Sequence, residues 1–228
     1  MGRPLAGGSV TLWHGKINAE ASDFPRYWGM LDPTEREQAG KFKREQLRLD
    51  YVFIHARLRE LLADYVNANP AQLQIHRTQF GKPYLPDFPD VKFNLSHTGD
   101  RMAVAMALDC ELGIDIELNK HRHTLPALVD KCFAESEKHY WLGLPEVEKS
   151  QVFYRFWTRK EAFVKATGRG IALGLNNCVV DVHYPDRFLS IPSAFGTPAD
   201  WTIHEFNIGE SICGALVARA KLGFLIDC

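Results

Sequence analysis

The sequence predicts an α+β fold in which each of two similar halves packs a small, mainly antiparallel sheet against a long helix. The chain runs strand, long helix and strands, and then helices and strands again. Short turns at Gly99-Asp100 and Asp109-Cys110 join three consecutive strands, which is typical of antiparallel neighbours. Its 228 residues, 46% of them hydrophobic, provide for one large core or two small ones. The halves are expected to meet near residues 108 to 115, which gives domains 1–110 and 111–228.

The first half is expected to begin with a strand from Ser9 to His14, followed by a long helix. Asp32 is a typical N-cap, because it precedes Pro33 and stands three residues before Glu35. This helix is expected to run to about Asn67 with a break near Gly40. The later elements are a helical turn at Asn69-Pro70, a strand from Gln72 to Thr78, a turn at Phe80-Gly81-Lys82-Pro83, and strands from Lys92 to His97 and Met102 to Leu108.

The second half is expected to begin with a strand from Gly113 to Leu118. The remaining elements are helices over Thr124 to Phe133, Ser136 to Leu142 and Glu146 to Thr167, and strands over Cys178 to Val182, Trp201 to Phe206 and Ile212 to Ala218. No low-complexity stretch or Gly/Ser linker separates the halves, so a compact monomer is expected.

Two motifs of the second half carry acidic side chains. Asp115 and Glu117 stand two apart in a strand and therefore point to one face. Glu161 and Lys165 stand four apart in a helix, just off the edge of its apolar stripe, and are therefore neighbours that face a cleft. Lys160 falls within that stripe, where a lysine is costly unless it meets an anion, so it too is expected to approach the site.

Three carboxylates beside a lysine supply hard oxygen ligands and a cation, which is what a Mg²⁺ ion holding a pyrophosphate requires. Each motif alone has a simpler interpretation. An Asp-x-Glu pattern in a strand is usually a solvated face, and a Glu-x-x-x-Lys pattern in a helix is usually a weak surface pair. The segment Lys92 to Gly99, which ends the strand just before the acidic one, shifts the interpretation from these simpler alternatives toward a metal site.

Asn94-Leu95-Ser96-His97 and Gly113-Ile114-Asp115-Ile116-Glu117 combine with one further motif in the last long helix. That motif consists of Trp157, Lys160, Glu161, Lys165, Gly168 and Gly170. Together, in this order and spacing, the three motifs resemble the surfactin-synthetase type of 4′-phosphopantetheinyl transferase. The likeness extends to Gly81-Lys82-Pro83 and to a basic helix containing Arg48, and it covers most of the chain.

The resemblance implies a pseudo-twofold pair of halves, with coenzyme A in the cleft between them and the metal ligands in the second half. It implies transfer of 4′-phosphopantetheine to a serine of an apo acyl or peptidyl carrier protein, with release of adenosine 3′,5′-bisphosphate. Asp115, Glu117 and Glu161 would hold Mg²⁺, or Mn²⁺ in its place, against the pyrophosphate. Lys165 would add a point charge. The general base is left open between Glu161, which is the first choice, Glu117 and a metal-bound water.

The same resemblance implies further contacts with coenzyme A. His97 would contact the 3′-phosphate, and Ser96 would offer a hydroxyl. Lys82 would reach the nucleotide, and so would Arg48, which lies in a basic run with Lys41. From the residues alone, each feature has a simpler interpretation. Ser96-His97 would be a turn with a buried histidine, Lys82 an exposed lysine, and the basic run of Arg48 a solvated helix face. Ser96 and His97 are not a hydrolase dyad, because adjacent strand residues face opposite ways.

The carrier protein is expected to dock beside the metal site, over residues 124 to 144. The apolar candidates, each of which could equally belong to the core, are Leu125, Leu128, Val129, Phe133, Tyr140, Trp141 and Leu144. His121-Arg122-His123 has a spacing compatible with a metal, but a basic loop facing an acidic carrier is the favoured interpretation. Fatty-acid, polyketide and nonribosomal-peptide carriers all present a serine, and the sequence does not choose among them.

Composition argues against several functional classes. A formal net charge of -1 argues against a general nucleic-acid binder. The five cysteines are odd in number and widely spaced, which argues against a disulfide framework or zinc cluster and fits a reducing cytoplasm. No apolar N-terminal segment and no run of about 18 apolar residues is present, so neither export nor membrane spanning is expected.

Two other functions use similar residues. A Mg²⁺-dependent phosphodiesterase or nuclease could employ the same acids and lysine, but it should show a basic groove, and the near-neutral charge counts against it. A non-catalytic coenzyme A-binding protein would be favoured by loss of a metal ligand, whereas all three acidic positions are kept. The transferase is therefore the favoured function.

Overall fold

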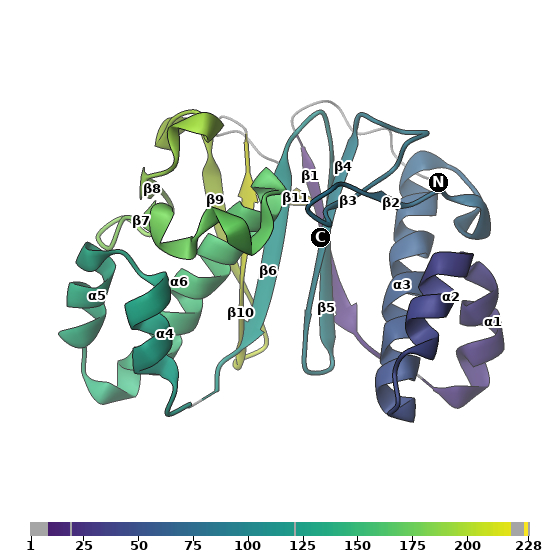
Figure 1. Cartoon of the computed structure of the whole chain (residues 1–228), viewed down its shortest axis with the longest axis horizontal. Helices are drawn as coiled ribbons and strands as arrows, with labels where there is room; N and C mark the ends of the chain where they lie inside the picture. The colour runs from purple at the N-terminus through teal and green to yellow at the C-terminus, as the bar shows by residue number, and fades with distance from the viewer. Residues whose placement is uncertain (1–8, 19, 121, 220–225, 228) are drawn as a thin grey trace.

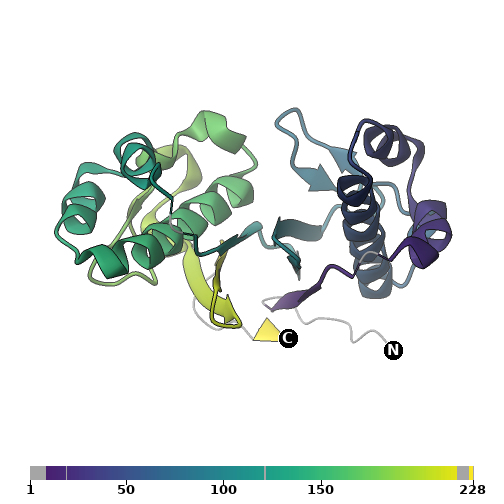
Figure 2. The ribbon, with the colours of Figure 1, turned by 90° about the horizontal axis from the view of Figure 1, so that it is seen from below.

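The computed structural model describes residues 9–18, 20–120, 122–219 and 226–227. Two sheets stand side by side in the middle of the molecule, with the helices of the first half on one side and those of the second half on the other (Figures 1 and 2). The predicted α+β class with two similar halves is confirmed.

The first sheet belongs mainly to the N-terminal half. Its order is β11-β1-β5-β4, formed by Ile226–Asp227, Val10–Lys16, Arg101–Leu108 and Val91–Thr98. Strands β1, β5 and β4 are antiparallel neighbours. The long helix α3 (Glu45–Val66) packs on one face, where its apolar side chains share a core with Met102, Val104 and Met106 of β5. The alternate residues of β5 therefore face the other way.

The remaining elements of this half are short. They are the 3₁₀ turns Ala21–Asp23 and Pro70–Gln72, the helices α1 (Phe24–Met30) and α2 (Pro33–Gly40), and the hairpin of β2 (His76–Arg77) and β3 (Pro83–Tyr84). The predicted capping box is confirmed, because Asp32 Oδ1 accepts from the Glu35 backbone N–H and Glu35 Oε2 accepts from that of Asp32. The expected strand over 72–78 is reduced to two residues, since Gln72 ends a 3₁₀ turn.

The second sheet has the order β6-β10-β9, formed by Leu112–Leu118, Ile212–Ala218 and Thr202–Ile208, all antiparallel. Helix α6 (Glu146–Thr167) packs across it. The other elements are α4 (Leu125–Cys132), α5 (Glu135–Leu142), β7 (Val179–Val180), β8 (Phe188–Ser190), and the 3₁₀ turns Gly170–Leu173, Leu175–Asn177, Ser193–Phe195 and Pro198–Asp200. The second half thus repeats the plan of a sheet covered by one long helix.

The prediction that β5 and β6 are paired neighbours is wrong. Both edges of β5 are taken by β1 and β4, so the chain passes through Asp109-Cys110 into a different sheet. The backs of the two sheets then share a core, in which Ala103, Ala105 and Ala107 of β5 meet apolar residues of β6 such as Ile114. Alanine at these positions lets the sheets approach closely.

Four cysteines, Cys110, Cys132, Cys178 and Cys213, are buried and unpaired. The fifth, Cys228, lies outside the described residues. Within the described ranges, no helix is both long and apolar enough to cross a membrane.

Candidate active site

The predicted acidic residues lie where β6 and α6 cross. Gly113 of β6 faces the backbone of α6, so the helix lies close against the strand. Asp115 and Glu117 follow Gly113 at the period of two that keeps side chains on one face. Glu161 and Lys165 belong to the last two turns of α6. The crossing therefore brings the three acids and the lysine into one region.

Asp115 is the most enclosed of the three acids, with 5% of its surface exposed. Its Oδ1 accepts hydrogen bonds from Lys165 Nζ at 2.6 Å and from Ser96 Oγ at 2.9 Å. Its Oδ2 is buried and has no hydrogen-bond partner among the described residues. Because a buried carboxylate oxygen without a partner is unfavourable, this atom is available to a further cation.

Lys165 is held at the base of the site by three oxygens. Besides Asp115, its Nζ donates to Ser96 Oγ at 3.1 Å and to the Ile114 carbonyl at 3.2 Å. The side chain remains 28% exposed. The ammonium is thus fixed in position while part of the side chain stays accessible, which suits a point charge directed at a phosphate.

The three carboxyl groups influence one another electrostatically. Burial raises the pKa of Asp115, and the positive charge of Lys165 opposes this. The pKa of Glu117 is raised by burial and then by the charge of Asp115. The pKa of Glu161 is raised by burial, then by Asp115, and to a lesser degree by Glu117. The acids therefore repel one another, and all three have a raised affinity for a proton.

The chemistry of this donor set fits a hard divalent cation. Carboxylate oxygens are the ligands that Mg²⁺ prefers, and its charge would reverse the mutual repulsion of the acids. The unpartnered Oδ2 of Asp115 offers one such ligand. Across the described residues, however, no group of three or more His, Cys, Asp or Glu side chains is gathered tightly enough for a metal ion. The acids share one region without converging on one point.

Side chains of β4 join the two sheets beside the acids. Asn94 Oδ1, Ser96 Oγ and Thr98 Oγ1 accept the backbone N–H groups of Ile114, Ile116 and Leu118 at 2.9, 3.3 and 3.3 Å. They thus act as strand carbonyls would in a continuous sheet. Ser96 also donates to Asp115, and Thr98 donates to Glu117 Oε2 at 3.4 Å. Sequence reasoning missed Thr98, although three polar residues at a period of two mark one face of this strand.

His97 belongs to β4, and its imidazole is influenced by charged groups on both long helices. The pKa of its imidazole is lowered, first by desolvation, then by the charge of Lys165 and by His55, while Asp50 opposes this. Lys165 belongs to α6, whereas Asp50 and His55 belong to α3. The predicted phosphate-binding residue is therefore coupled electrostatically to both the acidic site and α3.

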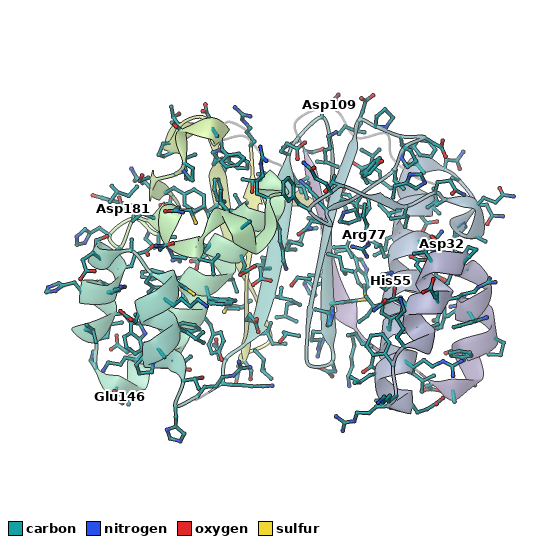
Figure 3. All side chains as sticks on the ribbon, viewed as in Figure 1. Asp32, His55, Arg77, Asp109, Glu146 and Asp181 are labelled. Atoms are coloured by element: carbon teal, nitrogen blue, oxygen red, sulfur yellow. The ribbon has the colours of Figure 1, made fainter. Side chains whose placement is uncertain are left out.

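A cavity of about 840 Å³ lies in the first half, bounded by α2, α3, the β2–β3 hairpin and β4. Its lining includes the basic side chains Lys41, His55 and Arg77 and the acidic side chains Asp32, Glu35 and Glu37, and it reaches Asn94. Figure 3 labels Asp32, His55 and Arg77, which lie close together in this half. The size is typical of a small-molecule site.

Arg48 does not line this cavity. Its guanidinium lies over the rings of Phe24 and Trp28 in α1, at 4.9 and 5.4 Å from their centroids. Its Nε is buried, with no hydrogen-bond partner in the described part of the chain. Arg48 therefore packs against α1, and its contact with a nucleotide stays a prediction.

Lys82 also lies outside the lining of the cavity. Its Nζ donates to oxygens of Glu111, Leu112 and Ala166, which belong to the second half. The structure thus places this ammonium at the end of α6, and its contact with a nucleotide stays a prediction.

The expectation that Lys160 approaches the acidic site is wrong. The side chain is fully buried, with its Nζ 2.7 Å from Glu137 Oε2 of α5 and hydrogen-bonded to the carbonyls of Leu175 and Cys178. A lysine in the apolar stripe did indicate a nearby anion. That anion is a buried glutamate of the core, which compensates the charge locally.

The region predicted to dock a carrier protein belongs largely to the core. Its buried members are Leu125, Val129, Phe133 and Trp141. Leu142 and Val147, at the turn between α5 and α6, are instead 64% and 82% exposed. His121 lies outside the described residues, so the interpretation of His121-Arg122-His123 as a basic loop stays a prediction. Arg122 is near enough to Glu117 for its charge to act against the raised pKa.

Comparison with protein families gives a match for each half. Residues 111–217 match a model described as the 4′-phosphopantetheinyl transferase superfamily. Residues 16–109 match a model described as the N-terminal part of 4′-phosphopantetheinyl transferase. The two matches meet between β5 and β6, where the chain passes from the first sheet to the second.

Individual relatives extend over much of the chain. The 4′-phosphopantetheinyl transferase HetI of Nostoc sp. is 29% identical over 223 residues, which cover 96% of this chain and 91% of HetI. The 4′-phosphopantetheinyl transferase Sfp of Bacillus subtilis is 28% identical over 159 residues, 69% of each chain. The slr0495 protein of Synechocystis sp. is 31% identical over 159 residues, and the match spans 65% of its length.

Proposed function

Because this chain belongs to the 4′-phosphopantetheinyl transferase superfamily, whose members use coenzyme A to modify carrier proteins, we propose that it converts apo carriers to their holo form. In this reaction a serine oxygen of the acyl or peptidyl carrier attacks the β-phosphorus of coenzyme A, and adenosine 3′,5′-bisphosphate leaves. The observation that carries the proposal is that three electrostatically coupled acids and Lys165 share one region where β6 and α6 cross, with Lys165 bonded to Asp115.

Asp115, Glu117 and Glu161 would hold Mg²⁺, or Mn²⁺ in its place. When bound, the ion would neutralise the pyrophosphate oxygens of coenzyme A. Two observations support this assignment: the unpartnered Oδ2 of Asp115, and the raised pKa values of Glu117 and Glu161, which follow in part from neighbouring carboxylates. A buried group of like charges is stable only with compensating cations.

Lys165 would stabilise the negative charge that develops on the leaving phosphate. Its ammonium is already fixed by Asp115 and Ser96, so little reorganisation is required during the reaction. Glu161 would accept the proton of the carrier serine. Its raised pKa increases its proton affinity, and it lies one helical turn from Lys165. Glu117, whose pKa is also raised, is the second candidate for this base.

The nucleotide part of coenzyme A would lie toward the first half. His97 would contact the 3′-phosphate, and Ser96 would add a hydroxyl donor. The electrostatic influence of both Lys165 and His55 on His97 supports this, because His55 lines the cavity. Arg48 would contact the nucleotide only if its guanidinium moved away from the rings of Phe24 and Trp28 in α1, so its proposed role is less direct than that of His97.

We also propose that the chain divides into two domains at 110/111 and acts as a monomer. It would work in a reducing compartment such as the cytoplasm. The four buried, unpaired cysteines fit such a compartment. The carrier would dock beside β6, near the exposed Leu142 and Val147 and the basic Arg122. Carriers of fatty-acid, polyketide and nonribosomal-peptide synthesis are the candidate partners.

The comparisons favour the transferase over a nuclease or a non-catalytic coenzyme A-binding protein. Intact-mass analysis tests this choice. The chain is incubated with coenzyme A, Mg²⁺ and a panel of apo carrier proteins, and each carrier is weighed. At least one carrier should gain the mass of one phosphopantetheine group, and its serine-to-alanine variant should gain nothing. A chain that binds coenzyme A but modifies no carrier would favour the non-catalytic function.

A further inference from the structure

The β2–β3 hairpin connects the cavity of the first half with the catalytic helix of the second. On one side, its residues Arg77, Pro83 and Tyr84 line the cavity. On the other side, Lys82 reaches the C-terminal end of α6. One short segment thus contacts both proposed parts of the coenzyme A site.

The ammonium of Lys82 is saturated with acceptors from the second half. Its Nζ lies 2.6 Å from the Ala166 carbonyl, 2.8 Å from Glu111 Oε2 and 3.4 Å from the Leu112 carbonyl. A lysine has three N–H donors, so these three oxygens use all of them. The side chain is only 14% exposed. In this arrangement the ammonium of Lys82 is directed at the second half, and Lys82 lies outside the lining of the cavity.

The acceptor on α6 is a favourable one for a cation. Ala166 belongs to the last turn of the helix, where carbonyl groups lack intrahelical partners and carry the negative end of the helix dipole. Glu111, at the start of the second half, adds a full negative charge. Lys82 therefore caps α6 from another part of the chain.

Two further contacts reinforce this connection. Gly168, the C-cap of α6, has a φ of 67°, and a Cβ built on it would lie 3.1 Å from Lys82 Cδ, so glycine makes room for the lysine stem. The guanidinium of Arg169 lies 5.2 Å from the ring centroid of Phe80, in the turn of the hairpin. The hairpin and the end of α6 are thus held together along several residues.

We propose that Lys82 is a positioning residue, which joins the β2–β3 hairpin to Glu111 and the end of α6 and so sets the distance between the nucleotide cavity and the acidic site. This inference rests on the proposed function, in which coenzyme A spans both places. Lys165 is the residue before Ala166, so a shift of the helix end would move the catalytic ammonium as well. Lys82 acts on coenzyme A through this geometry rather than through a contact of its own.

The test compares coenzyme A with one of its fragments. Under the proposed function, adenosine 3′,5′-bisphosphate would occupy only the cavity of the first half, whereas coenzyme A would reach both places. In Lys82→Met, we expect the Kd for coenzyme A to rise about fivefold, and that for the fragment to stay within about twofold of the wild type, both by calorimetry. A residue that contacts the nucleotide directly would instead weaken both ligands equally, and this result would overturn the proposal.

A second variant leaves the lysine in place. Glu111→Ala removes one partner of Lys82 but leaves the charge of Lys82 in place. We therefore expect the Kd for coenzyme A to rise selectively again, but by less than in Lys82→Met. If Lys82 were a nucleotide ligand, freeing it from Glu111 would leave the Kd unchanged or lower it. Lys92→Met is the matched control, because Lys92 is bonded to the Pro89 carbonyl on the surface of the same half, and neither Kd should change.

The outcomes separate the two proposals. A wild-type chain that binds neither ligand contradicts the proposed function and this inference with it. A wild-type chain that binds both ligands, with equal Kd changes for both in Lys82→Met, contradicts the positioning role alone. Melting temperatures of all variants confirm that each remains folded at the temperature of the titration.

Discussion

Gly113 of β6 lies directly beneath the carbonyl of Ala162 in α6: a Cβ built on this glycine would stand 2.1 Å from that oxygen. It would also stand 2.4 Å from the Ala166 backbone nitrogen. Only glycine permits this approach, which places Glu161 and Lys165 over Asp115. The glycine before the two acids therefore sets the geometry of the site.

Gly113→Ala should separate the helix from the strand. We expect a loss of about 2 kcal/mol in the free energy of unfolding, as for other overpacked positions, together with a larger loss of transfer activity. Urea denaturation measures the first and carrier modification the second. Gly29→Ala is the matched control, because nothing lies within 4 Å of its added Cβ in α1, and it should leave stability equal or higher. An active Gly113→Ala enzyme of unchanged stability would contradict the close crossing.

Removal of one acid should abolish catalysis and preserve the fold. Asp115→Asn and Glu161→Gln keep the shape of each side chain, so we expect transfer to fall at least about a hundredfold while the circular dichroism spectrum is unchanged. Rates with one apo carrier at saturating coenzyme A provide the measurement. Full activity of either variant would show that the corresponding carboxylate does not belong to the machinery.

Metal removal gives an independent check on the three acids. Treatment with a chelator should stop transfer, and added Mg²⁺ or Mn²⁺ should restore it, because the pyrophosphate and the acids need a shared cation. Melting temperature before and after chelation serves as the control for folding. Undiminished transfer in excess chelator would exclude the proposed ion.

His97→Ala should affect binding more than the maximal rate. If the imidazole contacts the 3′-phosphate, the Kd for coenzyme A should rise about tenfold while the Kd for dephospho-coenzyme A stays nearly constant. Titration of both ligands against both proteins decides the matter. Equal weakening of the two ligands would remove His97 from the 3′-phosphate.

The loss of stability on acidification should depend in part on Glu35, in a buried network of the first half. Burial alone would raise the pKa of Glu35, but its hydrogen bond with His55 and the charge of Arg59 outweigh burial and lower it below 4.5. A carboxylate with a lowered folded pKa contributes stability above its unfolded pKa and loses it as the pH falls through the folded value. Glu35→Gln should therefore lower the urea midpoint more at pH 7 than at pH 3.

The difference between the wild type and Glu35→Gln isolates the carboxyl group of Glu35, because every other acid with a shifted pKa is present in both proteins. Arg59 keeps its bond to Asp32 in the variant, so the network is weakened rather than left without an anion. A difference in midpoint that is the same at both pH values would contradict the assigned coupling.

Much of the fold follows from local sequence signals. The predicted limits of α6 agree with the structure, and the Asp32 capping box starts α2 as expected. The sequence analysis did not predict the short helix α1, because it has only seven residues, Gly29 weakens its helical propensity, and its place depends on packing of Tyr27 against Phe53 of α3. Tertiary contacts of this kind are absent from any local window.

The site was predictable where alternation and helical spacing act, and not where partners are distant in sequence. Those two periods predicted that Asp115 and Glu117 share one face and that Glu161 and Lys165 are neighbours, and the family resemblance implied that the two pairs form one site. The periods indicated that Lys160 meets an anion, but not that this anion is Glu137 of another helix. Likewise, the predicted pairing of β6 with β5 was wrong, because both edges of β5 are occupied by β1 and β4.

The central claim is that one divalent ion joins Asp115, Glu117 and Glu161 to the pyrophosphate of coenzyme A. The most direct measurement is the anomalous difference density of a crystal grown with coenzyme A and Mn²⁺. A single strong peak, in contact with all three carboxylates and with the bound pyrophosphate, is the expected result. A bound coenzyme A whose pyrophosphate lies away from these acids, or Mn²⁺ density at another place, would contradict the account.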